Sequence, residues 1–187
     1  AQYADAIELV QFENTTDTPS TTPRTITVTV NDGISNSNTA IATINVTAVN
    51  DAPTATNLSA GETYTEDTAL NLTDIVASDV DSANITATLT LSNVGAGSLN
   101  TGTSGAVTST FVGGVWTASG AIADVNALLA GVTFTPTLNF NSNFTIATSV
   151  SDGVAPAITG VKAMTGTPVN DAPTATNLSA GETYTED

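Results

Sequence analysis

A segment of 19 residues occurs twice in this chain without a single change. Residues 49–67, which begin Val-Asn-Asp-Ala-Pro and end Glu-Asp, return as residues 169–187, an offset of 120 positions. Local structural convergence does not preserve exposed residues such as Asn57 and Glu62, so we interpret the identity as the duplication of one coding unit. A period of 120 residues is the size of one small domain. The sequence therefore predicts a tandem array of such domains, of which this chain is a window.

Weaker similarity extends the repeat upstream. Residues 25–30 precede Asp32-Gly33 much as residues 144–150 precede Asp152-Gly153, and the two Asp-Gly pairs again lie 120 positions apart. We expect three parts: residues 1–48 as the C-terminal part of a preceding repeat, 49–168 as a complete repeat, and 169–187 as the start of the next. The two partial ends are together shorter than one period, so they cannot complete one domain between neighbouring chains.

Apolar and polar residues alternate with a period of two along much of the chain. Residues 25–30, 84–91 and 144–150 each place mainly apolar side chains at every second position and mainly threonine or serine between them. This alternation is typical of half-buried strands, and glycine with Asn or Asp separates the strands as turns. Many short strands of this kind predict an all-β fold, a Greek-key β-sandwich related to the immunoglobulin type.

One segment departs from this alternation. Residues 124–131 begin with Asp124, which suits a helix N-cap, and end with Gly131, which suits a helix stop. Val125, Leu128 and Leu129 have the spacing of one helix face. We expect one or two helical turns laid against the core and a weaker counterpart at residues 3–10, so the predicted architecture is a tandem β-sandwich with one short helix per repeat.

The charge balance excludes several classes of partner. Eighteen acidic residues face one arginine, Arg24, and one lysine, Lys162, for a formal net charge of −16. A nucleic-acid binder needs a basic surface, so we expect no nucleic-acid partner, and an anionic membrane would repel the chain. Its apolar runs are only a few residues long, so we also expect no direct membrane insertion.

The chain also lacks the usual catalytic side chains. It contains no histidine and no cysteine, which removes the common proton shuttle, the thiolate nucleophile, most zinc sites and any disulfide. We therefore expect no enzymatic activity. Trp116 is most simply a core or sheet-face residue, and stacking on a sugar is the alternative.

Acidic residues gather where strands are expected to end. Asn50-Asp51 lie in a proline-stiffened linker that continues to Pro53, Glu66-Asp67 follow 15 residues later, and Asp79-x-Asp81 places two carboxylates at i and i+2. Calcium takes six to eight oxygen ligands from carboxylates, Asn side chains and backbone carbonyls. An Asp-x-Asp loop can direct both carboxylates to one ion. Solvated loop acids are the simpler alternative for any one of these motifs.

Taken as a set, these motifs resemble the cadherin-like repeats of large bacterial surface adhesins. The set comprises Val-Asn-Asp-Ala-Pro at a junction, Glu-Asp on the first strand, Asp-Val-Asp-Ser further along and Ser/Asn-Asp-Gly before the last strand, and it covers essentially the whole chain. The resemblance implies a seven-stranded sandwich with calcium, Ca²⁺, bound between successive domains. It also implies an extracellular or cell-surface location and a role in adhesion.

The resemblance implies roles for ten residues as candidate metal ligands. The linker residues would be joined by an Asp-x-Asp pair from the domain that follows, and a Glu-Asp pair at the far end of that domain would serve the next junction. The Asp-Gly residues would come from the C-terminal half of the preceding domain, with a plain turn as the equal alternative. In that order, the candidates are Asn50, Asp51, Asp79, Asp81, Glu66, Asp67, Asn170, Asp171, Asp32 and Asp152.

The chain departs from the animal cadherin pattern in two ways. It has neither an Asp-x-Asn-Asp-Asn linker nor an Asp-Arg-Glu motif, so we expect one or two ions per junction and not three. The Asp-x-Asp motif of the second junction would begin near position 199, so that site is expected to be incomplete here.

Three functions compete at this level. The first is a calcium-rigidified spacer of a long secreted or surface adhesin, whose partners are the neighbouring repeats of the same chain. The second is a subunit of a self-assembling filament or surface layer, in which exposed edge strands pair with other copies. The third is a carbohydrate-binding module that uses Trp116.

Overall fold

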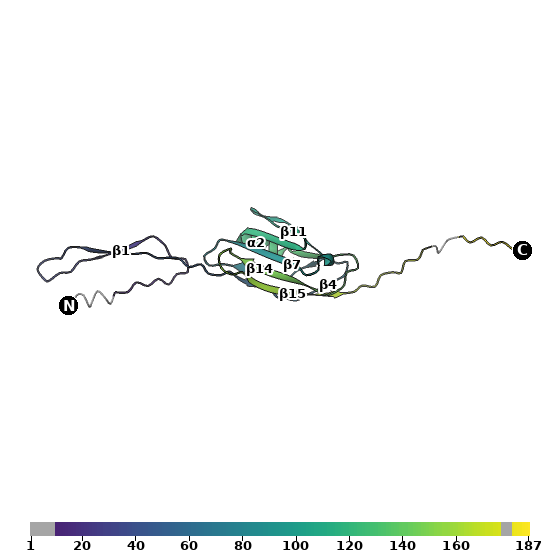
Figure 1. The fold of residues 1–187 in the computed structure, drawn as a ribbon, viewed down its shortest axis with the longest axis horizontal. Helices are drawn as coiled ribbons and strands as arrows, with labels where there is room; N and C mark the ends of the chain where they lie inside the picture. Colours follow the sequence, from purple (N-terminus) through teal and green to yellow (C-terminus); the bar gives the residue numbers. More distant parts are fainter. Residues whose placement is uncertain (1–9, 177–180) are drawn as a thin grey trace.

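The computed structural model describes residues 10–176 and 181–187, and the complete repeat forms an all-β body at its centre (Figure 1). A two-stranded ribbon lies on the N-terminal side of this body, and the C-terminal segment leaves its opposite end. Two layers of strands enclose the core, so the all-β, sandwich-like prediction is confirmed. No helix in the described part of the chain has both the length and the apolar character needed to cross a membrane.

The larger layer is a six-stranded sheet. In spatial order its strands are β11 (Thr110–Val112), β12 (Val115–Ala121), β7 (Asn84–Leu91), β14 (Phe144–Ser151), β15 (Ile158–Thr167) and β4 (Glu62–Thr65). Neighbouring strands are antiparallel except β15 and β4, which run parallel. The period-two pattern fixes which side faces inwards: in β7 the aliphatic residues are buried and the threonines between them are half-buried.

The second layer is built from shorter pieces. It contains β5 (Leu70–Asn71), β13 (Thr133–Pro136) and β8 (Gly97–Leu99) in one sheet, β3 (Thr54–Thr56) and β6 (Val76–Ser78) in another, the hairpin β9 (Thr103–Ser104) and β10 (Val107–Thr108), and the 3₁₀ turn η1 (Val94–Ala96). Phe134 and Trp116 are among the largest buried side chains between the layers. The Trp116 Nε1 donates to the Asn100 carbonyl at 3.0 Å, which confirms its prediction as a core residue and leaves no ring face for a sugar.

The expected helix is present as α2 (Ile122–Ala130), with Val125 and Leu129 buried against the core and Gly131 at its C-terminal end. Its N-cap was predicted wrongly. Ala121 occupies that position, and Asp124 lies in the first turn, where its charge favours the positive end of the helix dipole and its carboxylate accepts from Ser104 Oγ at 3.2 Å. The counterpart predicted at residues 3–10 lies outside the described residues except for Val10.

One buried ion pair ties the second strand of the repeat, β4, to its last strand, β15. The Lys162 Nζ of β15 donates to Glu62 Oε1 of β4 at 2.9 Å and to the Thr73 carbonyl at 3.0 Å, with the lysine fully buried. Lys162 is the only basic residue in residues 49–168. The complete repeat therefore presents no lysine or arginine at its surface.

Upstream, the ribbon of β1 (Arg24–Val28) and β2 (Ala40–Ile44) is an antiparallel pair. It occupies the sequence positions that β14 and β15 occupy 120 residues later. The turns correspond in detail, because Gly33 and Gly153 both have positive φ (95° and 85°). Asp32 and Asp152 each accept hydrogen bonds from the amides two and three residues ahead.

Candidate functional site

The linker before the complete repeat folds against two loops of that repeat. The Asp51 backbone N–H donates to Asp81 Oδ2 at 2.9 Å, and Asn50 Nδ2 donates to Asp152 Oδ2 at 2.6 Å. Asp81 lies in the loop between β6 and β7, and Asp152 in the turn between β14 and β15. Four of the ten predicted ligands are thus in direct contact at one end of the sandwich.

The loop between β6 and β7 owes its shape to Asp79. Asp79 Oδ1 accepts from the backbone N–H groups of Asp81 and Ser82, at 3.1 and 2.8 Å. Short polar side chains commonly bond amides two and three residues ahead in this way, and the contact bends the chain into a tight turn. The turn carries Asp81 to the linker, where it contacts Asp51; the hydrogen bonds of Asp79 stay within its own loop.

Asp152 was predicted at the wrong end of its domain. The turn lies in the C-terminal half of its repeat, and the resemblance implies that it serves the junction that follows, with a plain Asp-Gly turn as the equal alternative. The contact with Asn50 instead places Asp152 at the junction that precedes its own repeat. The reason is topological: β14 runs back along the sheet, antiparallel to β15, so the turn between them returns to the N-terminal end.

Two carboxylate oxygens at this junction have no hydrogen-bond donor. Asp79 Oδ2 and Asp81 Oδ1 are both buried and without a partner among the described residues. Buried polar atoms are rarely left unpaired, because losing water without a replacement costs free energy, most of all for a charged group. Hard cations bind oxygen ligands of this type, so the donor set at the junction fits Ca²⁺.

The described residues do not contain three acidic side chains already gathered around one point. Asn50 directs its Nδ2 group, a donor, at Asp152, and the same nitrogen also donates to the Asp51 carbonyl at 2.8 Å. To bind a cation, this side chain must turn so that Oδ1 replaces Nδ2. The junction therefore contains carboxylate and amide groups of the kind that bind a cation, but in this structure hydrogen bonds join them to one another.

The local hydrogen bonds keep these carboxyl groups ionised. Burial raises the pKa of Asp79, as does the nearby charge of Asp152, but the backbone N–H groups of Ser82 and Asp81, together with the adjacent Asp81 side chain, lower it by more, and the pKa lies below the ordinary 3.8. The Asn50 side chain, followed by the Val154 amide, lowers the pKa of Asp152 in the same way. Two mutually repelling carboxylates therefore stay charged at neutral pH, as a cation site requires.

Glu66 lies at the opposite end of the repeat, beside the second linker, as expected. Its side chain is buried, Oε2 accepts from Asn141 Nδ2 at 2.7 Å, and Oε1 accepts from the Val169 backbone N–H. Asn170 repeats the contact of Asn50, donating to the Asp171 carbonyl at 3.2 Å. Glu66 thus anchors the linker through an amide.

Two predicted ligands, Asp67 and Asp32, form their hydrogen bonds with residues outside the two linkers. Asp67 has a positive φ of 60° and accepts from the Asn139 backbone N–H at 2.8 Å, which fixes a loop of its own repeat. Asp32 bonds only its own turn among the hydrogen bonds resolved, at 2.9 Å to Ile34 and 2.8 Å to Ser35. The turn joins β1 to β2, and these contacts are those of the plain Asp-Gly turn that the sequence offered as the equal alternative to a ligand role.

Sequence reasoning missed Asp17. This acidic residue lines a cavity of about 340 Å³ together with Asn14, Pro19, Val49 and Asp51. It is a carboxylate from the preceding repeat facing the linker. It had no comparable signal in the sequence, because it lies eight positions before the predicted strand at residues 25–30 and belongs to none of the recognised motifs.

No protein-family model and no curated protein matches the chain. The case for a function therefore depends on the junction itself. Its distinguishing property is that acidic side chains from separate loops meet at a linker without any basic residue among them.

Proposed function

We propose that the chain is a calcium-rigidified spacer made of tandem sandwich repeats in a long extracellular or cell-surface adhesin. The observation that carries the proposal is the pair of buried, unpartnered oxygens Asp79 Oδ2 and Asp81 Oδ1 beside the linker. The Greek-key, cadherin-like character of the repeats and the adhesive role of the parent protein belong to the same proposal and are supported by the sequence resemblance.

The physical basis is charge repulsion at a joint. Asp51, Asp79, Asp81 and Asp152 bring four carboxylates to one end of the repeat, and Asn50 supplies an amide side chain. Without a cation, like charges push the loops and the linker apart, and only hydrogen bonds oppose this. A bound Ca²⁺ would neutralise the repulsion and fix the linker to both loops, which stiffens the connection between repeats.

The exact repeat of the linker supports a regular array. Residues 169–187 carry the same Asn-Asp linker as residues 49–67, and both Asn side chains make the same contact to the following carbonyl. Each repeat thus ends where an equivalent junction begins. A mechanical spacer requires this arrangement because its length grows by one unit per repeat.

Two measurements test the proposal. Isothermal titration calorimetry measures calcium binding to this chain, and thermal unfolding compares its melting temperature in calcium and in EGTA. Extracellular calcium modules have dissociation constants on the order of 0.1–1 mM. At 10 mM calcium such affinities stabilise the folded state by about 1.4–2.7 kcal/mol, which raises the melting temperature by roughly 5–10 °C.

Matched variants locate the site. Asp81→Asn keeps an acceptor for the Asp51 amide but removes a charge, so it should weaken calcium binding at least tenfold. Asp74→Asn makes the same chemical change next to β5, away from the junction, and should bind calcium like the parent. Equal binding by both variants, or no heat and no melting shift in the parent, would overturn the proposal.

A further inference from the structure

The outer face of the six-stranded sheet carries no ionisable side chain. Its outward positions on the four central strands, all within the described residues, hold only threonine, serine, alanine, valine and one asparagine. These are Val115, Thr117, Ser119 and Ala121 of β12, Asn84, Thr86, Thr88 and Thr90 of β7, Thr145, Ala147, Ser149 and Ser151 of β14, and Thr159, Val161, Ala163, Thr165 and Thr167 of β15. We call this surface the neutral face.

The strand register arranges the neutral face in rows. One row crosses four strands as Thr117, Thr88, Ser149 and Thr159, so hydroxyl groups lie side by side. The adjacent row is Val115, Thr90, Ala147 and Val161, which is mostly aliphatic. On the other side of the first row, Ser119, Thr86 and Ser151 form a further row of hydroxyl-bearing side chains, so the methyl-rich row borders a hydroxyl-rich band.

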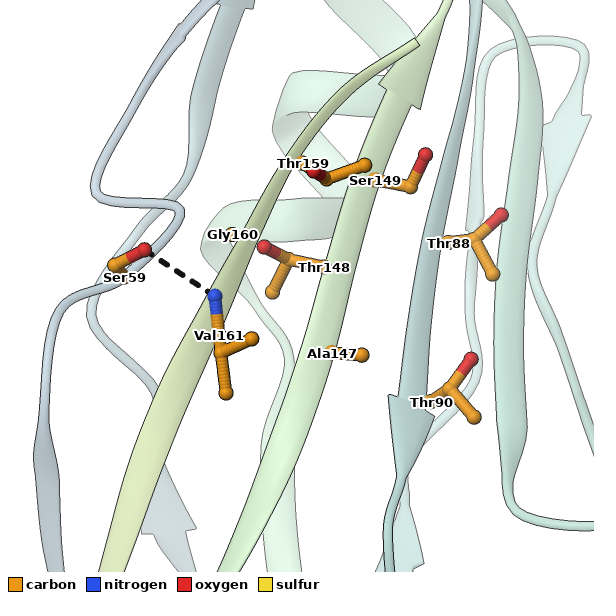
Figure 2. A pocket seen from close by; sticks show the side chains of 9 residues that line it. All are labelled: Ser59, Thr88, Thr90, Ala147, Thr148, Ser149, Thr159, Gly160 and Val161. Atoms are coloured by element: carbon orange, nitrogen blue, oxygen red, sulfur yellow. Dashed lines mark hydrogen bonds between the residues drawn. The ribbon is translucent and has the colours of Figure 1, made fainter.

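A shallow groove of about 620 Å³ runs along this face (Figure 2). The small residues Ala147 and Gly160 lie on its strands β14 and β15, and Thr88 and Thr90 line it from β7. Ser59 bounds the other side, where its Oγ accepts from the Val161 backbone N–H at 3.2 Å. No aromatic ring lines the groove, so it lacks the stacking platform on which sugars are commonly held.

The charges of the repeat lie elsewhere. Asp79, Asp81 and Asp152 are at one end, where they meet the first linker, and Glu66 is at the other end. Asp124 lies on α2, and Lys162 is buried, so no surface cation offsets the acids of the repeat. Two copies of this chain therefore repel each other in most orientations, and the neutral face is the large surface on which they meet without opposing carboxylates.

We propose that the neutral face is a lateral contact for a second copy of this chain, packed face to face about a two-fold axis. Such a contact is self-complementary, because each copy presents the same rows of hydroxyl and methyl groups. Interface cores are depleted of charged residues, as this face is. A cationic partner would bind the acidic ends of the repeat in preference to the neutral face. An anionic partner has no basic side chain to bind on this face.

The size of the face sets the strength of the contact. Four strands at about 4.8 Å, each with some seven residues at about 3.4 Å, give roughly 450 Å² per copy. A stable interface buries about 800 Å² per partner, so a single pair of faces associates weakly. Tandem repeats would present several such faces in series, and their contacts would add through effective concentration. Only this last step rests on the proposed spacer function; the contact itself does not.

The chain contains no cysteine, so a single introduced thiol reports proximity between copies. Val161→Cys places it on the neutral face, where Val161 is 52% exposed. Thr135→Cys places it at an exposed position of β13 in the opposite layer. With a short bis-maleimide crosslinker we expect at least tenfold more dimer from Val161→Cys, and more again as added salt screens the net charge.

A second substitution checks that the contact is face to face. Thr88→Asp, added to Val161→Cys, introduces a carboxylate on both sides of the contact and should reduce crosslinking to the level of Thr135→Cys, with unchanged thermal unfolding showing that the fold is intact. The result should be the same in calcium and in EGTA. Equal crosslinking of Val161→Cys and Thr135→Cys, or no effect of Thr88→Asp, would overturn the proposal and leave the face to another neutral partner.

Discussion

Asn50 Nδ2 lies 2.6 Å from Asp152 Oδ2, although 102 positions separate the two residues. The contact joins the linker, which precedes the first strand of the repeat, to the turn between its last two strands, β14 and β15. Because Asp152 also neighbours Asp79 electrostatically, this single hydrogen bond ties the linker into the acidic junction. The stability of the junction should therefore depend on whether residue 50 donates a hydrogen bond to Asp152.

Replacing Asn50 by aspartate should make the junction strongly dependent on calcium. Asn50→Asp exchanges the amide donor that faces Asp152 for a carboxylate, so like charges meet where a hydrogen bond was. We expect a lower melting temperature than the parent in EGTA and a larger rise on adding calcium. Differential scanning calorimetry measures both, and an equal calcium-induced rise in variant and parent would contradict the expectation.

Acid should weaken the fold through the junction aspartates. The pKa values of Asp79 and Asp152 are lowered from 3.8, mainly by hydrogen bonds to their charged forms. The unfolded chain then takes up protons at a higher pH than the folded chain, so the stability from these groups is complete above 3.8 and is lost as pH falls below it. Urea unfolding between pH 6 and pH 3 should show the decline, and Asp152→Asn should make it shallower. A decline of the same slope in Asp152→Asn would assign the acid sensitivity to other groups.

Removing the buried lysine should destabilise the repeat far more than removing a surface charge. Lys162→Met leaves Glu62 buried with no cation, at a cost of about 3–5 kcal/mol in the free energy of unfolding. Adding Glu62→Gln, which removes the uncompensated charge, should restore a large part of the loss. Urea denaturation of both variants tests this, and a single variant within 1 kcal/mol of the parent, roughly the size of a surface pair, would contradict it.

The single tryptophan offers a direct check of the core. Trp116 is 1% exposed and its Nε1 is bonded to a carbonyl. Its emission should be blue-shifted relative to free tryptophan and resist quenching by iodide until the chain unfolds. Trp116→Ala should cost about 3–5 kcal/mol of stability. Efficient quenching of the folded chain would place the ring at the surface and reopen the sugar-binding alternative.

The strands and the helix were predictable because their signals are local. Alternation along residues 84–91 reflects one buried face, and Gly131 ends the helix as expected. The junction partners were harder. The end of the molecule at which Asp152 lies depends on strand direction, and the pairing of Lys162 with Glu62 depends on the parallel contact of β15 with β4, neither of which the surrounding residues encode.

The helix start shows a different limit. Asp124 is a residue type that suits an N-cap, but the N-cap is Ala121, three residues earlier and the last residue of β12, and the helix begins at Ile122. The preceding strand fixes where the chain enters the helix, so tertiary structure overrides the local preference for an acidic cap. Asp124 still contributes from the first turn.

The most direct test of the calcium-locked junction is a diffraction map of crystals grown in calcium. The account predicts a density peak near Asp79 and Asp81 with oxygen neighbours at about 2.4 Å, including the now-unpartnered Asp79 Oδ2 and Asp81 Oδ1, and with Asn50 Oδ1 turned towards it. A map at saturating calcium in which these carboxylates keep only their amide hydrogen bonds, with no ion between them, would contradict it.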